Sequence, residues 1–332
     1  MTRSVTVDTS VTVTRRWSRL MGCRGSVTVS AAAGEIEAML AESVRLLRHL
    51  ERCWSRFRPE SDISRLNRAG GQAVDVDAST VVLLREMANA AQVTDGAFDP
   101  TLLGAIVGLG YGPAWSNGPE CGWQAAADVG IDRRAGWVDD TMIDVDGSRV
   151  CLPPGVQLDP GAIGKGLAAD IVVAEIYGVG AAAVRVVVGG DVRSSAPTIV
   201  GIGAPDGSGR IIDRISIAAG GVATSGTGRR WASPGGDIVH HVLDPRTRRS
   251  VAHRGPLEIV QVSVAAATGA SAEAWATASL VDGPTIVAER LDQRRVAALA
   301  VGRDGSMFPN SEWRSLQIGL DPTEGHRRAV AV

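Results

Sequence analysis

The segment 156–170, Val-Gln-Leu-Asp-Pro-Gly-Ala-Ile-Gly-Lys-Gly-Leu-Ala-Ala-Asp, constrains the fold of this chain more than any other stretch. We expect the end of a strand at Val156–Leu158, then a glycine-rich turn, then a helix that continues through Ile176. Its three glycines allow backbone N–H groups to approach a ligand closely, and the helix N-terminus that follows favours an anion. The segment therefore predicts an anion-binding turn between a strand and a helix.

Lysine occurs once in the chain, at position 165 inside this turn, and arginine supplies the other positive charges. A compact ammonium in a glycine-rich turn suits a phosphate, although a plain strand-to-helix connection would explain the glycines equally well. A Walker A motif is excluded, because Asp159 replaces its first glycine and Gly166 replaces its Ser or Thr. The dinucleotide fingerprint fails at Asp206, where the third glycine belongs.

The spacing of apolar residues predicts helices and strands that are intermixed along the chain. Helices are expected at 34–54, 79–92, 271–281 and 284–291, and strands at 27–29, 184–188, 199–202, 211–217, 259–264 and 296–301. Because strands and helices do not alternate strictly, we predict an α+β fold of mixed sheets with flanking helices. We expect a ragged segment at 1–16, a single two-lobed domain at 17–320 and a tail at 321–332.

Charge and composition argue against several classes of protein. A net charge of −2 is unlike the basic footprint of a nucleic-acid-binding protein. The four cysteines show no C-x-x-C spacing, so neither a zinc site nor a disulfide framework is indicated. No apolar run reaches the roughly 18 residues of a membrane span. Leu20–Cys23 looks like a lipoprotein cleavage box, but arginines precede it instead of an apolar segment, and we predict a cytoplasmic protein.

Three further groups of residues could carry chemistry. Residues 220–228 are small and polar and could line a ligand or form a flexible turn. His240 and His241 are adjacent, so on an extended segment only one of them can enter a site, as a general base or as a structural residue. Glu273 and Thr277 are four residues apart on a predicted helix, where they could bind Mg²⁺ through oxygen or simply be solvated.

Taken together and in this order, these segments resemble the ApbE-type FAD:protein FMN transferases. The resemblance covers roughly residues 17–305 and is strongest at Leu158–Asp170. Its other matching segments are Met21-Gly22, Ser61–Asn67, Thr94–Thr101, Gly189–Asp191, Ala223–Gly226, His241–Thr247 and Ala272–Thr277. The resemblance implies an ApbE-like, T-fold-like architecture. It also shows departures, since Glu273 stands where the family usually has aspartate, Arg248 where it has glycine and Trp275 where it has an aliphatic residue.

The resemblance also implies a reaction and a set of site residues. The FMN phosphoryl moiety of FAD would move to a threonine hydroxyl of an acceptor protein, and AMP would leave. FAD contacts are implied for Met21, Phe57, Ala97, Phe98, Asp99, Asp159, Lys165 and Leu243. The Mg²⁺ ligands implied are the carbonyl of Ala162, the carboxylate of Glu273 and the hydroxyl of Thr277, and His241 would deprotonate the acceptor. Two alternatives stay open, namely hydrolysis of FAD to FMN and AMP in the same site, or FAD binding without turnover.

Overall fold

The computed structural model describes residues 10–111, 148–228, 230–233, 236–251, 258–283, 291–319 and 330–331. The described helices are α1 (Ile36–Trp54), α2 (Asp62–Arg68), α3 (Ala78–Val93), α4 (Leu103–Gly108), the 3₁₀ helix η3 (Pro160–Ala162), α5 (Gly164–Gly178), α6 (Gly269–Asp282) and α8 (Ser311–Leu316). Among these described helices, none is both long and apolar enough to cross a membrane.

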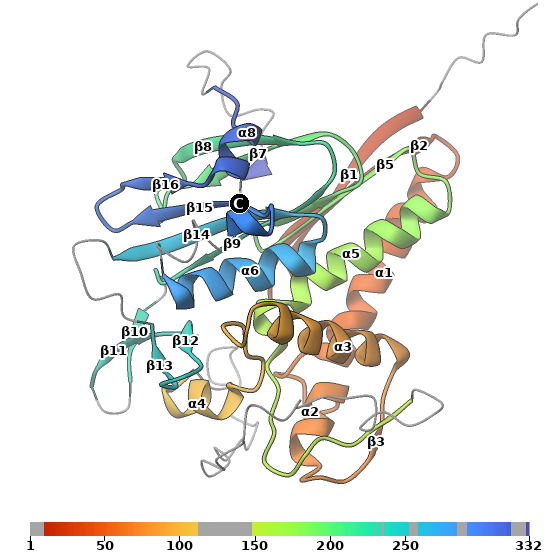
Figure 1. Ribbon diagram of the computed structural model, residues 1–332. Helices are drawn as coiled ribbons and strands as arrows, with labels where there is room; N and C mark the ends of the chain where they lie inside the picture. Colours follow the sequence, from red (N-terminus) through yellow and green to blue (C-terminus); the bar gives the residue numbers. More distant parts are fainter. Residues whose placement is uncertain are drawn as a thin grey trace, which may run out of the picture.

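An eight-stranded antiparallel sheet forms the centre of the molecule, in the order β1-β2-β5-β6-β9-β14-β15-β16 (Figure 1). Its strands are β1 (Ser10–Leu20), β2 (Cys23–Ala32), β5 (Ala183–Val188), β6 (Asp191–Ser194), β9 (Gly220–Gly226), β14 (Ile259–Ala266), β15 (Ala297–Gly302) and β16 (Met307–Pro309). Smaller sheets are formed by β3 (Val74–Asp75), β4 (Arg149–Val150), β7 (Thr198–Gly203), β8 (Ile211–Ile217), β10 (Arg230–Ala232), β11 (Ile238–His240), β12 (Leu243–Asp244), β13 (Arg249–Ser250) and β17 (Val330–Ala331).

Both faces of the large sheet are covered. Helices α1, α5 and α6 lie on one face, and β7, β8 and α8 lie on the other (Figure 1). Strand β5 illustrates the pattern, because Val186 belongs to the core under the helices while its neighbour Val187 packs against the second core. In that second core Trp313 is fully buried and donates its indole N–H to Asp213 Oδ2 at 2.8 Å. The predicted α+β class is therefore confirmed.

The long periodic segments agree with the structure. The helices expected at 34–54 and 79–92 are α1 and α3, and the strands expected at 184–188 and 259–264 are β5 and β14. The helix expected at 284–291 falls almost entirely outside the described residues.

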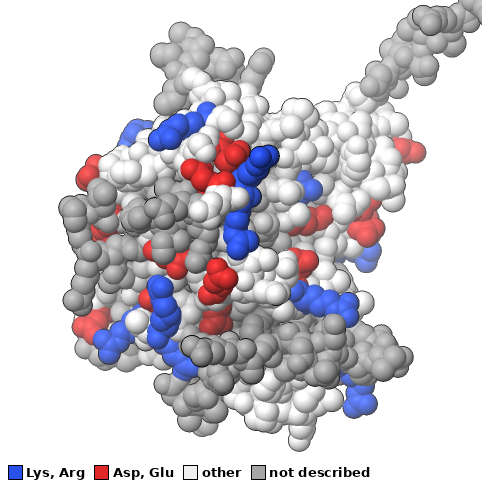
Figure 2. Space-filling view, in the orientation of Figure 1, with Lys and Arg blue, Asp and Glu red and all other residues white. Residues whose placement is uncertain are grey.

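On the face shown in Figure 2, basic and acidic side chains are interspersed over the described surface, in keeping with the small net charge.

Three local expectations differ from the structure. Strand β1 begins at Ser10, inside the segment expected to be ragged, because the alternating Val and Thr residues of Val11–Thr14 pair with β2. Val156–Leu158 is not a strand: the amide of Asn67 bonds the backbone of Leu158 on both sides, at 2.7 and 2.9 Å, and takes the place of a neighbouring strand. Residues 220–226 form the central strand β9 rather than a turn.

Helices α5 and α6 approach each other so closely that only glycine fits at their contact. A Cβ atom on Gly166 would lie 2.3 Å from the carbonyl oxygen of Gly269. A Cβ atom on Gly221 of β9 would lie 2.6 Å from the backbone of the same Gly269. All of these neighbouring atoms belong to the backbone, so they cannot move aside as a flexible side chain could. The glycines at 166, 221 and 269 thus set the separation of α5, α6 and β9.

We expect Gly166→Ala to destabilise the protein by about 1–3 kcal/mol, the usual cost of forcing an extra methyl group into a closely packed interior. Gly178→Ala is the matched control in the same helix, since nothing lies within 4 Å of the Cβ it would add. Its free energy of unfolding should be unchanged or slightly higher. Urea denaturation of the three proteins measures the difference, and equal midpoints for both variants would contradict the close contact described here.

Candidate active site

One ammonium and two carboxylates meet where α5, α6 and β6 come together. Lys165 Nζ contacts a carboxylate oxygen of Glu273 and lies 3.3 Å from Asp191 Oδ2. The other oxygen of Glu273 accepts the backbone N–H of Gly166 at 2.8 Å. The Glu273 side chain is 4% exposed, compared with 28% for Lys165. A carboxylate of the protein thus lies at the N-terminus of α5, where the sequence predicted an external anion.

Burial and charge oppose each other in this cluster. Burial raises the pKa of Glu273 to about 7, against the attraction of Lys165 and with a further contribution from Asp191. Burial likewise raises the pKa of Asp191, although Lys165 opposes the change. For Lys165, burial lowers the pKa, but the attraction of Glu273 and Asp191 outweighs it and the net shift is upward. Two buried carboxylates share one ammonium, so the cluster favours an additional positive charge.

The two helices cap each other. Glu273 of α6 accepts an N–H from the first turn of α5, and Asp170 of α5 accepts the N–H groups of Gly269 and Ala270 at 2.8 and 2.9 Å. Arg193 of β6 donates to the same Asp170 carboxylate at 2.6 Å. This arrangement fixes the start of α6 and therefore the direction of Glu273. Thr277, one turn further along, contacts Ser225 of β9 with its hydroxyl at 3.0 Å.

A cavity of about 340 Å³ opens beside this cluster. It is lined by Arg19, Met21, Gly22, Glu51, Trp54, Ser55, Arg56, Phe57, Arg58, Asp159, Pro160, Gly161, Gly164 and Lys165. Four residues that the resemblance implied as FAD contacts are therefore brought together, namely Met21, Phe57, Asp159 and Lys165. Met21 has a φ of 54°, a left-handed conformation that forms the sharp turn between β1 and β2.

Arg56 contacts two other residues that line this cavity, Phe57 and Asp159. It is 5% exposed, its Nε lies 3.2 Å from Asp159 Oδ2, and its guanidinium lies over the rings of Phe57 and Tyr111 at 4.2 and 5.3 Å. Asp159 also accepts the N–H of Gly161 at 2.9 Å. A planar cation between aromatic rings and a carboxylate is well ordered, so it can orient a ligand that has both flat and charged parts.

The two histidines lie in different surroundings. His240 is 5% exposed, and its Nε2 lies 2.9 Å from the carbonyl oxygen of Val251, so it holds β11 to the following segment. His241 is half-buried, and its ring stacks on that of Tyr111 with 6.1 Å between centroids. Tyr111 in turn lies under Arg56, which lines the cavity. His240 therefore has a structural contact, whereas the ring of Tyr111 lies between His241 and Arg56 of the cavity lining.

The remaining predicted site residues do not line this cavity. Phe98 is buried in the core and Ala97 lies beside it, while Asp99 caps its own turn by accepting the N–H of Thr101 at 2.8 Å. That turn is nevertheless adjacent to the site, because the carbonyl of Pro100 accepts the N–H of Asp159 at 2.8 Å. Leu243 packs with α4 in a separate small core. Ala162 is half-buried in η3, just before Gly164.

Sequence reasoning assigned no role to Asp191, Arg56 or Asp170. Asp191 follows a strand and two glycines, a signal that was visible, but only the fold places it against Lys165. Arg56 is one of many arginines in the sequence and nothing there sets it apart. Arg248, which stands where the resemblance implies glycine, has a φ of 57°. This lies in the left-handed region that glycine adopts without strain.

The sequence model of the ApbE family matches residues 21–300. A protein of Rhodobacter capsulatus named FAD:protein FMN transferase is 31% identical over 310 residues, covering 88% of this chain and 56% of the relative. The chain thus spans little more than half the length of that relative. A protein of the same name from Treponema pallidum is 32% identical, over 79% of this chain and 76% of the relative.

Solved structures of two other proteins resemble this chain in fold. The ApbE protein of Thermotoga maritima superposes with a TM-score of 0.73 at 23% identity, covering 93% of this chain and 100% of the other. The flavinyl transferase ApbE of Pseudomonas stutzeri, in its apo form, also superposes with a TM-score of 0.73. It is 22% identical, and the match covers 92% of this chain and 97% of the other. At this level of identity the likeness supports the architecture.

The capping role of Asp170 predicts a stability effect. Asp170→Asn removes the charge that three donors share, so we expect a loss of about 1–3 kcal/mol in the free energy of unfolding. Asp206→Asn is the control, because that carboxylate bonds only within an exposed turn, and its unfolding midpoint should hardly change. Urea titration followed by circular dichroism compares the two, and an Asp170→Asn protein as stable as wild type would remove this residue from the α5–α6 contact.

Proposed function

Because this chain belongs to the ApbE family, we propose that it is a transferase that moves the FMN moiety of FAD to an acceptor protein. The observation that carries the proposal is the cavity lined by Met21, Arg56, Phe57 and Lys165, whose ammonium contacts the buried carboxylates of Asp191 and Glu273. Aromatic and apolar walls suit a flavin ring, and charged groups at one end suit a pyrophosphate.

We further propose that Mg²⁺ acts in this site, held by the Glu273 carboxylate, the Thr277 hydroxyl and the Ala162 carbonyl. The donor set fits, because all three ligands offer oxygen, which Mg²⁺ prefers. The excess of buried negative charge around Lys165 also favours a cation there. When bound, Mg²⁺ would offset negative charge on the phosphate oxygens of FAD.

Residues of the chain would bind the ligand and accept the proton of the acceptor. Arg56 and Phe57 orient the ligand in the cavity, and Lys165 offers its ammonium to the phosphates. His241 accepts the proton of a threonine hydroxyl on the acceptor. The threonine oxygen then bonds to the phosphorus on the FMN side of the pyrophosphate, the bond from that phosphorus to the bridging oxygen breaks, and AMP leaves.

The predicted cytoplasmic location stays a prediction.

The test mixes the full chain with FAD, Mg²⁺ and threonine-containing acceptor peptides, and follows AMP release and peptide mass. A peptide that gains the mass of FMN together with release of AMP supports the transferase. AMP and free FMN without a peptide product would indicate FAD hydrolysis instead. Retention of FAD without AMP in the presence of every peptide would indicate a flavin-binding protein, and would contradict the proposed activity.

Substitutions at Glu273 test the metal site. Glu273→Gln should abolish Mg²⁺-dependent AMP release, because the amide carries no charge, while circular dichroism stays that of wild type. Glu273→Asp withdraws the carboxylate by about 1.5 Å, one carbon–carbon bond, and should lose the hydrogen bond from Gly166. We therefore expect reduced activity and a higher Mg²⁺ requirement, although the substitution restores the family's usual acid. Full activity of Glu273→Gln at matched Mg²⁺ would exclude the residue as a ligand.

The adjacent histidines provide a matched pair for the base. His241→Ala should reduce transfer roughly 10²–10⁴-fold, the usual contribution of a positioned general base, with FAD affinity nearly unchanged. His240→Ala loses the contact to the Val251 carbonyl and should lower the unfolding midpoint, with transfer by the folded enzyme largely retained. Single-turnover transfer and thermal unfolding separate the two effects. Inactivity of His240→Ala alone would show that the roles are assigned to the wrong residue.

A further inference from the structure

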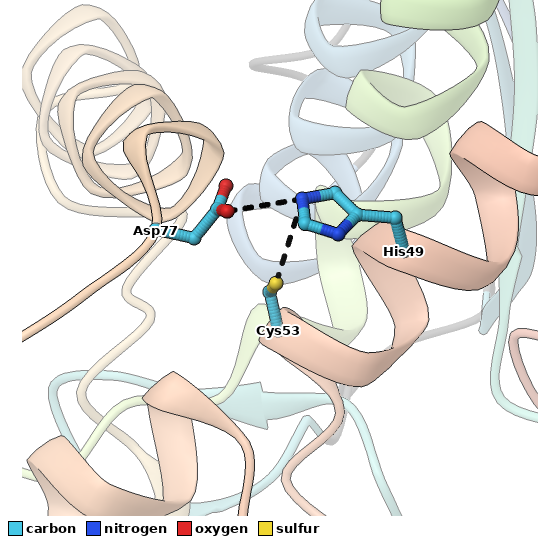
Figure 3. Close-up of side chains that lie close together, drawn as sticks. All are labelled: His49, Cys53 and Asp77. Carbon is cyan, nitrogen blue, oxygen red and sulfur yellow. Dashed lines mark hydrogen bonds and ion pairs between the residues drawn. The ribbon is translucent and has the colours of Figure 1, made fainter.

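Three potential metal ligands of different types converge between α1 and α3, outside the cavity. His49 Nε2, Cys53 Sγ and Asp77 Oδ2 all lie within 4.8 Å of one another (Figure 3). His49 and Cys53 are one turn apart on α1, so they share a face, and Asp77 is the residue that caps the N-terminus of α3. The separations are 3.1 Å from His49 Nε2 to Asp77 Oδ2 and 3.8 Å from the same nitrogen to Cys53 Sγ.

Around a neutral histidine, Nε2 can donate to Asp77 or accept from the Cys53 thiol, but it cannot do both. If Nε2 carries a proton, it donates to Asp77 and offers no lone pair to the Cys53 thiol. If Nε2 is bare, the thiol can donate to it, but two acceptors then face each other across 3.1 Å at Asp77. A cation among the three atoms would satisfy all of them at once.

The two separations from His49 Nε2 are close to those of tetrahedral coordination. Bonds of 2.0–2.3 Å to nitrogen, oxygen and sulfur place the donor atoms of a zinc site about 3.3–3.6 Å apart. The distances from His49 Nε2 to Asp77 Oδ2 and to Cys53 Sγ, 3.1 and 3.8 Å, lie on either side of that range. Asp77 is already oriented for the task, because its other oxygen, Oδ1, accepts the N–H and the hydroxyl of Ser79 at 2.9 and 2.6 Å. Such a second partner fixes the direction of a metal-binding carboxylate.

We propose that His49, Cys53 and Asp77 bind a divalent transition metal, best fitted by Zn²⁺, with water as the fourth ligand. A thiolate ligand selects a borderline-soft ion over Mg²⁺. The side chains of His49 and Asp77 are 33% and 35% exposed, so an ion can reach the site from solvent. Burial raises the pKa of the Cys53 thiol to about 11, so binding must release its proton. The spacing of the cysteines did not reveal this site, because two of its ligands are not cysteines and Asp77 joins only in the folded chain.

The position of the cluster indicates what the ion would do. Cys53 is followed directly by the residues 54–58, which line the cavity. A metal that joins the last turns of α1 to the start of α3 would fix the end of α1 and with it Trp54 and Arg56. The role inferred is therefore that of a structural clip beside the cavity, and it does not depend on the activity proposed above.

Cobalt provides a readout that is specific for sulfur ligation. The full chain is freed of metal with a chelator and titrated with Co²⁺ in excess Mg²⁺, which occupies sites made of oxygen ligands. We expect one equivalent of Co²⁺ per chain, with a thiolate-to-cobalt charge-transfer band that Zn²⁺ abolishes by displacement. Cys53→Ser should lose the band, and Cys151→Ser, which alters an exposed cysteine, should keep it.

Two further measurements keep the test decisive. Asp77→Asn keeps all four cysteines and should weaken Zn²⁺ binding at least 10-fold, and Zn²⁺ should raise the unfolding temperature of wild type more than that of this variant. Circular dichroism shows whether each variant is folded. A charge-transfer band that survives Cys53→Ser, or a wild-type protein that binds no stoichiometric Zn²⁺, would overturn the proposal and leave the cluster as a His–Asp ion pair that caps α3.

Discussion

The contact between α5 and α6 at Gly166 and Gly269 is the constraint on which the site depends. Because the two backbones meet without intervening side chains, each helix can cap the other: Glu273 of α6 accepts an N–H of α5, and Asp170 of α5 accepts two N–H groups of α6. Each pairing places negative charge at the positive end of a helix dipole. The close approach and the direction of Glu273 therefore have a single structural cause.

The contact between α5 and α6 also brings charged side chains together. Lys165, which lines the cavity, contacts both Glu273 and Asp191, and both carboxylates are largely removed from water. Burying such groups gives little net stability, since the loss of hydration offsets their attraction to the ammonium. The excess of negative charge is useful for binding a hard cation, which is the requirement of the transfer chemistry proposed here.

Another part of the cavity lining depends on α1. Its last turns carry His49 and Cys53, and the chain then continues directly into Arg56, which joins Asp159 to the rings of Phe57 and Tyr111. The order of this wall is thus coupled to how firmly α1 is held against α3. A metal clip at Asp77 and the α5–α6 contact would then fix the two sides of the cavity by independent means.

The sequence by itself determined the elements with strong periodicity, such as α1, α3 and β5, and it singled out Lys165, because its signals lie within a few residues of each other. The tertiary structure decided the rest. The strand and two glycines before Asp191 are visible in the sequence, but its pairing with Lys165 is not, and local spacing does not tell which of His240 and His241 stacks on Tyr111. The same holds for Val156–Leu158, where Asn67 replaces a strand. Pairing between distant residues has no signature in local spacing, and only the packed fold creates it.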